Sequence, residues 1–317
     1  MNTPNGIIVR LSDPDATVRR LAVLDLPYSD EDDIAPLLVT ALADPDAGVR
    51  AEAAKALEGY DDDESVEALA ACMADADPAV RAAAGDTLAE LKSPGCGRHL
   101  IPYLSNPSAE TVMRALRALR ALRVPEALDP ALRLLLHEDA SVRKEAAGVL
   151  GYLKHVGAVA DLAHAAIEDA DSEVRRIAIG ALGFADEVSA LPALIRALKD
   201  ESWMVREEAA QTIGKLRGKP ATDQLIGLLD DAFWQVRLKA VRSLGLLKAT
   251  EAVMPIAGQL LHEVGNLRKE AVIALGEIGD RAAIPALEAA GGDPDPDVRK
   301  LSKLALTSIQ LNSRGQA

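Results

Sequence analysis

Residues 139–151, DASVRKEAAGVLG, contain the phrase that decides the fold. In this phrase an acidic turn is followed by Val142-Arg143 and then by a run rich in Ala and Leu. The same apolar-Arg pair recurs along the chain, with its arginine at Arg19, Arg50, Arg81, Arg143, Arg175, Arg206, Arg237, Arg268 and Arg299. The spacing is nearly constant, except for one doubled step that conceals a degenerate copy around Met113-Arg114. Self-similarity at a fixed period predicts a repeat protein of about ten copies.

Each copy is expected to form two helices. Acidic turns such as Asp44-Pro45-Asp46 would begin the second helix, because Asp accepts hydrogen bonds from free N–H groups and Pro fits a first turn. Gly-containing turns such as Leu182-Gly183 and Leu275-Gly276 would end it. The first helices carry prolines that we expect in their first turns, namely Pro36, Pro130, Pro192, Pro255 and Pro285. No segment alternates like a strand, so the predicted fold is all-α.

Stacking of these hairpins follows from their size, since a 31-residue hairpin cannot bury its apolar stripe alone. The sequence therefore predicts one right-handed α-solenoid over residues 1–317. Its parts would be an N-terminal capping repeat (1–28), central repeats (29–290), and a C-terminal capping helix with a tail (291–317). The repeated Arg would lie at the edge of the buried face and pair with the acidic turn of the adjoining repeat. We expect an Arg–Asp ladder along the stack.

The motif V-R-x-x-A-A-x-x-L-G, found at Val142 to Gly151, resembles the short HEAT-like repeats of the phycobilisome-lyase HEAT family. The resemblance covers nearly the whole chain. It implies that the second helices line a concave surface, and it allows the function of a bilin lyase or isomerase subunit that holds a phycobiliprotein. Because this architecture serves many unrelated functions, the resemblance indicates the fold more than the activity.

Positions −2, +1, +2, +5 and +9 from the repeated Arg cluster opposite the buried stripe, on the expected concave face. Aromatic residues, Met and Arg are enriched in interface cores, and this face carries several of them. The candidate partner-binding residues, including the two tryptophans on its flank, are Lys144, Tyr152, Arg176, Phe184, Trp203, Met204, Glu208, Trp234, Lys239, Arg242 and Glu270. They predict a protein or peptide partner; the alternative is an ordinary solvated face.

Trp203 and Trp234 occupy the same position, −3 from the repeated Arg, in two adjacent repeats. We expect them to stand one above the other at the starts of two second helices. There they could anchor a partner or pack between repeats.

The degenerate fourth repeat contains Arg114, Arg117, Arg120 and Arg123. Some of these side chains should reach the concave side and form a basic collar suited to a carboxylate or phosphate. The alternative is a set of solvated arginines that make local ion pairs.

The net charge of −14 is uneven, because residues 1–100 hold 20 acidic and 8 basic side chains whereas the rest hold 29 and 27. Acidic surface repels nucleic acid and anionic membranes. The sequence shows no signal peptide, no apolar run of ~18 residues, and no metal or disulfide pattern around Cys72 and Cys96. We expect a cytosolic, bacterial protein that binds neither nucleic acid nor membrane, and a homodimer is possible.

Catalysis is not expected, although two enzymes share this architecture. The di-iron deoxyhypusine hydroxylase places His-Glu pairs on second helices, whereas His137-Glu138 and His262-Glu263 fall at the ends of first helices. The corresponding positions hold Lys144-Glu145 and Lys269-Glu270, and Lys is no iron ligand, so neither a metal nor another cofactor is predicted. The HEAT-like DNA glycosylases need a basic channel, which an acidic chain does not offer. The predicted function is a protein-binding scaffold; the alternative is a chaperone or maturation factor for one client.

Overall fold

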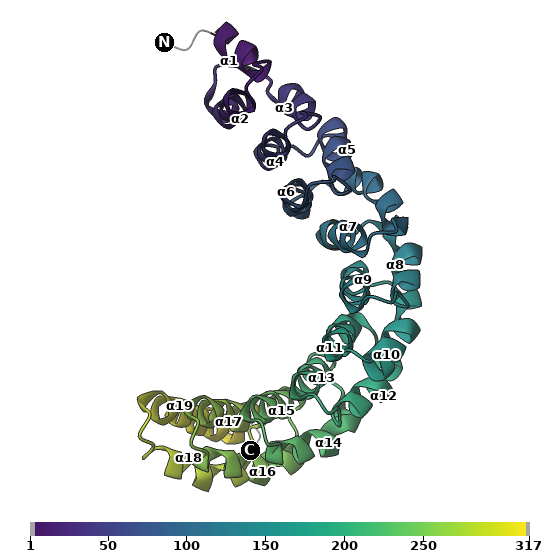
Figure 1. The fold of residues 1–317 in the computed structure, drawn as a ribbon. Helices are drawn as coiled ribbons and strands as arrows, with labels where there is room; N and C mark the ends of the chain where they lie inside the picture. Colours follow the sequence, from purple (N-terminus) through teal and green to yellow (C-terminus); the bar gives the residue numbers. More distant parts are fainter. Residues whose placement is uncertain (1–3, 315–317) are drawn as a thin grey trace. The chain divides into compact units, whose positions relative to one another are not determined.

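The computed structural model describes residues 4–314, and these form ten consecutive helical hairpins without a β-strand. The chain divides into two compact units, Met1–His155 (unit 1) and Val156–Ala317 (unit 2). In each unit, Figure 1 shows the second helices of the hairpins along one side and the first helices along the other. The prediction of an all-α solenoid with about ten repeats is confirmed.

The second helices are the longer and more regular elements. In unit 1 they are α2 (Ala16–Asp25), α4 (Ala47–Ala56), α6 (Pro78–Ala89), α7 (Ala109–Leu122) and α9 (Ala140–Leu153). In unit 2 they are α11 (Ser172–Ala181), α13 (Trp203–Leu216), α15 (Trp234–Leu247), α17 (Gly265–Ile278) and α19 (Pro296–Arg314). Successive second helices pack side by side within a unit, as α13, α15, α17 and α19 do.

The first helices are shorter and are often preceded or followed by a 3₁₀ turn. In unit 1 they are α1 (Pro4–Leu11), α3 (Ala35–Ala41), α5 (Asp63–Cys72) and α8 (Leu128–Leu134). In unit 2 they are α10 (Val159–Glu168), α12 (Glu187–Ala197), α14 (Thr222–Gly227), α16 (Val253–Gly258) and α18 (Ile284–Ala290). In the fourth hairpin two 3₁₀ segments, Pro94–His99 and Ile101–Ser105, replace the first helix, where Pro94-Gly95 and Pro102 interrupt the chain.

The acidic turns begin the second helices as predicted. Asp46 accepts a hydrogen bond from the N–H of Val49, and Asp171 accepts from those of Glu173 and Val174. Each carboxylate satisfies a helix N–H that has no partner within the helix.

Two details of the predicted helix ends are wrong. Pro192 lies inside α12 rather than in its first turn, because Asp186 caps the helix through the N–H of Ser189 and so begins it earlier. Gly276 lies inside α17, which continues to Ile278 and ends at Gly279 with φ of 75°. Gly276 instead permits a close helix approach, since a Cβ there would lie 3.0 Å from Cβ of Ala305 on α19.

The core is a continuous layer between first and second helices in each unit. The valine before the repeated Arg is fully buried, for example Val142 and Val205, as are the apolar residues one and two turns later, such as Leu150 and Ile213. Burial of these aliphatic side chains at about 25 cal/mol per Å² is the main stabilising contribution to the stack. Within residues 4–314, no helix combines the length and apolar character that crossing a membrane requires.

Candidate functional site

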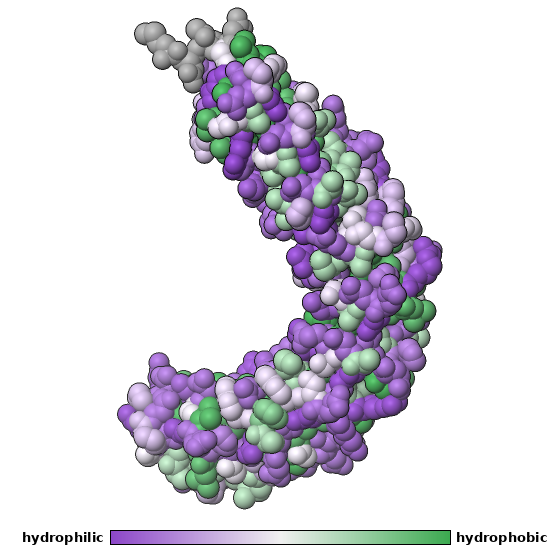
Figure 2. Space-filling view, viewed as in Figure 1, coloured by the Kyte–Doolittle hydropathy of each residue, from purple (hydrophilic) through white to green (hydrophobic). Residues whose placement is uncertain are grey.

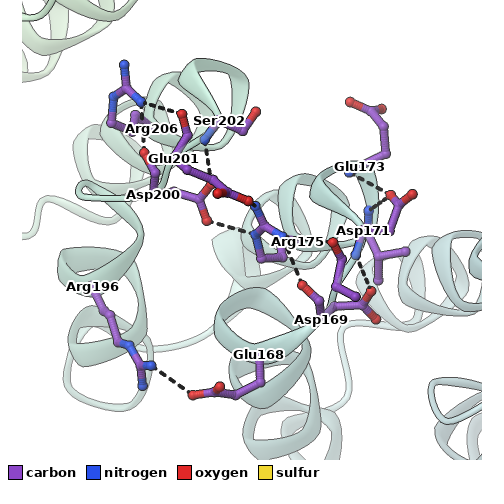
Figure 3. Close-up of polar contacts among 12 residues, drawn as sticks. Glu168, Asp169, Asp171, Glu173, Arg175, Arg196, Asp200, Glu201, Ser202 and Arg206 are labelled. Atoms are coloured by element: carbon purple, nitrogen blue, oxygen red, sulfur yellow. Dashed lines mark hydrogen bonds and ion pairs between the residues drawn. The ribbon is translucent and has the colours of Figure 1, made fainter.

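Arginine–aspartate pairs link consecutive hairpins and form the predicted ladder. Among the described residues five rungs are bidentate pairs spaced by 25 residues, namely Arg19–Asp44, Arg50–Asp75, Arg175–Asp200, Arg206–Asp231 and Arg268–Asp293. In the rung drawn in Figure 3, Arg175 Nε donates to Asp200 Oδ2 at 2.8 Å and Nη2 donates to Oδ1 at 2.9 Å. Both side chains are buried, with 7% and 11% exposed.

The remaining donor of each ladder arginine binds its own turn. Arg175 Nη1 donates to the carbonyl oxygen of Asp169 at 2.9 Å (Figure 3) and to that of Ala170 at 3.3 Å. The same two bonds recur at Arg206, where Asp200 and Glu201 accept. A guanidinium whose N–H groups bond to the aspartate of the next hairpin and to the carbonyl oxygens of its own turn acts as a structural connector between repeats.

The ladder perturbs the titration of its carboxylates. The hydrogen bonds from Arg19 hold the pKa of Asp44 below its ordinary value, and those from Arg268 do the same to the pKa of Asp293. An opposite charge at hydrogen-bond distance favours the ionised form. Ionisation of these carboxylates therefore stabilises the ladder.

The fourth repeat breaks the ladder at a position that differs from the predicted one. Thr111 and Val112 are buried on α7, at the positions that Val142 and Arg143 occupy one repeat later on α9. Val112, rather than Arg114, therefore occupies the ladder position. The degenerate copy predicted around Met113-Arg114 is present as α7, but its register differs by two residues, because burial rather than the local apolar-Arg pattern sets it.

His137 and His262 stand in place of the ladder aspartate. The Nδ1 atoms of both accept a backbone N–H two residues ahead, from Asp139 and Val264, each at 3.0 Å. In ordinary rungs an aspartate Oδ1 accepts this bond, as Asp200 does from Ser202. Both histidines are thus turn-forming residues.

The two positions that correspond to the hydroxylase His-Glu pairs are likewise engaged in local contacts. Lys269 forms ion pairs with Asp295 and Asp297, at 3.3 and 3.6 Å. Glu145, expected on the exposed face, is buried with 5% exposed and accepts from two arginines of α7. In the described part of the chain no group of three or more His, Cys, Asp or Glu side chains is arranged to hold a metal ion.

The arginines of α7 form local ion pairs. Arg117 and Arg120 bind the two carboxylate oxygens of Glu145 at 3.4 and 3.3 Å, and Arg114 binds Glu110. The guanidinium of Arg120 also lies 5.9 Å from the ring centroid of Tyr152, which is half exposed. Two arginines of the predicted collar, Arg117 and Arg120, are thus tied to α9, whereas Arg114 pairs within α7.

In unit 2 most of the candidate residues belong to the second helices, and the exposed sides of α11, α13, α15, α17 and α19 are called the second-helix face. Polar contacts cross from helix to helix. Lys239 on α15 donates to Gln211 on α13 at 2.7 Å, and Arg242 contacts Glu270 and Glu277 on α17 at 3.2 and 3.6 Å. Burial raises the pKa of Glu270, although the charge of Arg242 opposes that shift.

Other candidates on or beside this face make shorter-range contacts. Arg176 pairs with Glu173 on its own helix at 2.8 Å, and Glu208 reaches toward Gly180 of the preceding second helix. Phe184 ends a 3₁₀ turn after α11, and Met204 lies in the first turn of α13; both are half-buried, as is Lys144 on α9 in unit 1. Figure 2 shows apolar residues interspersed with hydrophilic ones on the visible face of each unit.

The tryptophans begin α13 and α15 as expected, but the ring on which Trp203 stacks is that of Phe233 rather than Trp234. The ring centroids of Trp203 and Phe233 are 5.5 Å apart at 15°, and the guanidinium of Arg206 lies 5.9 Å from the Phe233 centroid. Phe233 was not among the predicted candidates because it lies just before α15. Its position next to Trp234, in a chain with two phenylalanines, is the signal that points to it.

A comparison with known protein families identifies the repeat of this architecture. A family model described as HEAT repeats matches residues 4–89, 97–183, 159–233 and 222–307. No curated protein matches the sequence significantly.

Solved structures share the fold at low sequence identity. An engineered protein has a TM-score of 0.54 at 21% identity, and the match covers 98% of this chain and 99% of that one. The YibA protein of Escherichia coli has a TM-score of 0.55 at 19% identity, covering 94% and 98%. Kap95p, in a structure with RanGDP, has a TM-score of 0.67 at 14% identity, covering 96% and 51%. The present chain thus spans about half the length of Kap95p.

Proposed function

Because this chain belongs to the HEAT-repeat family, whose model matches most of its length, we propose that it is a non-catalytic scaffold that binds a protein partner on its second-helix face. The observation that carries the proposal is the surface of unit 2. There half-buried Ile177, Leu238 and Ile273 lie among charged side chains that are held by contacts between neighbouring helices. An apolar surface with fixed polar groups is typical of an interface.

The comparison with Kap95p supports a protein as the partner. Kap95p, which shares the fold over most of this chain, binds RanGDP by the description of its structure. Repeat solenoids offer extended surfaces for such partners because each repeat adds another pair of helices to the array. The net charge of −14 favours a protein over nucleic acid or an anionic membrane.

The test is capture of partners from extract of the source cells, with mass spectrometry as the readout. Wild type is compared with Arg176→Glu/Arg242→Glu on the second-helix face. The matched control is Arg133→Glu/Arg196→Glu, which makes the same charge change at exposed arginines of α8 and α12. Loss of a partner from the first variant alone is the expected result, whereas equal recovery from all three proteins contradicts the proposal.

The same experiment addresses the narrower proposal that the chain is a maturation factor of the phycobilisome-lyase HEAT type. One client at fixed stoichiometry supports that function, and several weakly held proteins support a general scaffold. A cytosolic location belongs to this proposal as well; Cys72 and Cys96 are both buried free thiols, which suits a reducing compartment.

A further inference from the structure

An open groove of about 550 Å³ lies on the second-helix face between α15, α17 and α19. Its apolar lining consists chiefly of Leu246, Ile273, Leu301 and Leu304. Leu304 is 59% exposed, although its helix, α19, packs against α17. The groove is large enough for one or two aliphatic side chains of a ligand.

Glycine creates the depth of this groove. A Cβ on Gly245 would lie 2.9 Å from the Ala274 Cα, and one on Gly276 would lie 3.3 Å from the Ala305 Cα. The three helices therefore approach each other through Gly and Ala, and the larger side chains on either side stand above this floor. Such a floor is formed by packed helices and needs no rearrangement before a ligand enters.

The rim of the groove is positively charged. Arg217 and Lys248 line it, and both are exposed residues in the left-handed conformation that ends α13 and α15, with φ of 59° and 53°. Arg217 Nη1 donates to the carbonyl oxygen of Leu246, which holds the guanidinium beside the apolar lining. Within residues 4–314 neither cation is paired with a carboxylate, whereas Glu277, the acidic lining residue, lies 3.6 Å from Arg242.

We propose that this groove binds an acidic segment of the partner protein that inserts a leucine-sized side chain between α15, α17 and α19. Charge complementarity selects the segment: two unpaired cations flank an apolar floor in a chain whose net charge is −14. A nucleic acid would need many more cations and would leave the apolar floor unused. The inference rests on the proposed function, because it names the partner chemistry for part of the same face.

The test measures fluorescence anisotropy with three labelled 12-residue peptides of matched length. One combines Glu with Leu, the second combines Glu with Ser, and the third combines Lys with Leu. Only the Glu/Leu peptide should bind, and its affinity should fall as salt is raised. Comparable binding of the Glu/Ser peptide, or preferred binding of the Lys/Leu peptide, would overturn the proposal.

Variants of the groove residues test whether the Glu/Leu peptide binds in this groove. Arg217→Glu/Lys248→Glu should weaken the Glu/Leu peptide by at least about tenfold, and Leu304→Ser by about threefold, because each removes one part of the complementarity. The matched control, Arg196→Glu/Lys199→Glu, changes two exposed basic residues at the end of α12 and should leave the affinity unchanged. Circular dichroism and thermal melting confirm that each variant is folded. Unchanged affinity in both groove variants would exclude this groove.

Sedimentation velocity identifies the competing occupant. A dimer that dissociates when Arg217 and Lys248 are changed to Glu would mean that a second copy fills the groove, which overturns the proposal. The partner capture described above distinguishes failure of the groove proposal from failure of the proposed function. A partner lost from Arg176→Glu/Arg242→Glu but retained by Arg217→Glu/Lys248→Glu refutes the groove alone, whereas retention by both variants refutes the second-helix face as the binding surface.

Discussion

Arg237 and His262 have the 25-residue spacing that joins an arginine to an aspartate elsewhere in the ladder, yet each bonds within its own turn. Arg237 Nε donates to the carbonyl oxygen of Asp231, and His262 Nδ1 accepts the N–H of Val264. A second break combines Val112 with His137 at the same spacing. There the arginine and the aspartate are absent together.

These two positions predict opposite responses to the same substitution. His262→Asp places a carboxylate within reach of Arg237 and retains an acceptor for Val264, so it should stabilise the chain by about 1 kcal/mol. His137→Asp faces Val112 and should give no gain. Urea denaturation of both variants measures this difference. Equal shifts of the two midpoints would show that the ladder pair itself contributes nothing.

An intact rung should contribute stability that depends on pH. Asp293→Asn leaves an oxygen to accept from Asp295 but removes the charge that pairs with Arg268, and should cost about 2 kcal/mol at pH 7. The pKa of Asp293 is lowered by Arg268 from an ordinary value of 3.8. The contribution is therefore complete above that value and is lost as the pH falls through the lower folded-state pKa.

Denaturation midpoints of wild type and Asp293→Asn, taken from pH 7 to pH 2, test this. The two curves should converge in acid. Glu288→Gln on α18 is the control, because that carboxylate is exposed and its loss should change little at any pH. A gap that persists unchanged at pH 2 would refute the ionic origin of the effect.

The ladder was predictable because both of its partners recur with the period of the sequence. Two features could not be predicted from the sequence. The register of α7 depends on burial of Thr111 and Val112, and the local pattern at Met113-Arg114 conceals it. The burial of Glu145 depends on arginines of the preceding helix.

The candidate surface was predictable in outline only. Helical periodicity placed Lys239, Arg242 and Glu270 on one face, but the contacts among these side chains depend on how closely α13, α15 and α17 approach one another. The groove was missed because its floor is glycine and alanine, and because Arg217 acts from a helix end that no motif marks. The partner-binding role of Lys239, Arg242 and Glu270 stays a prediction.

Glu270 should destabilise the folded chain when it is ionised. Burial raises its pKa above the ordinary value of 4.5, so the folded state disfavours the charged form at neutral pH. Glu270→Gln should therefore raise stability at pH 7 by about 0.5–1 kcal/mol. The gain should disappear below about pH 4, where the carboxyl is protonated in both states.

Thermal melts of Glu270→Gln and wild type at pH 7 and pH 3.5 measure that difference. Glu277→Gln removes a more exposed carboxylate next to the same Arg242, and serves as the matched control. A loss of stability in Glu270→Gln at pH 7 would mean that the attraction of Arg242 exceeds the cost of burial.

Close packing of second helices should make two glycines respond in opposite directions to alanine. A Cβ on Gly245 would lie 2.9 Å from the Cα of Ala274 on α17, whereas one on Gly227 would meet nothing within 4 Å. Gly245→Ala should push α15 and α17 apart and cost about 2 kcal/mol. Gly227→Ala, at the end of α14, should gain up to ~1 kcal/mol through reduced chain entropy. Denaturation midpoints decide between them, and a gain in both variants would show that α15 and α17 leave room for a methyl group, which would also remove the basis for a pre-formed groove floor.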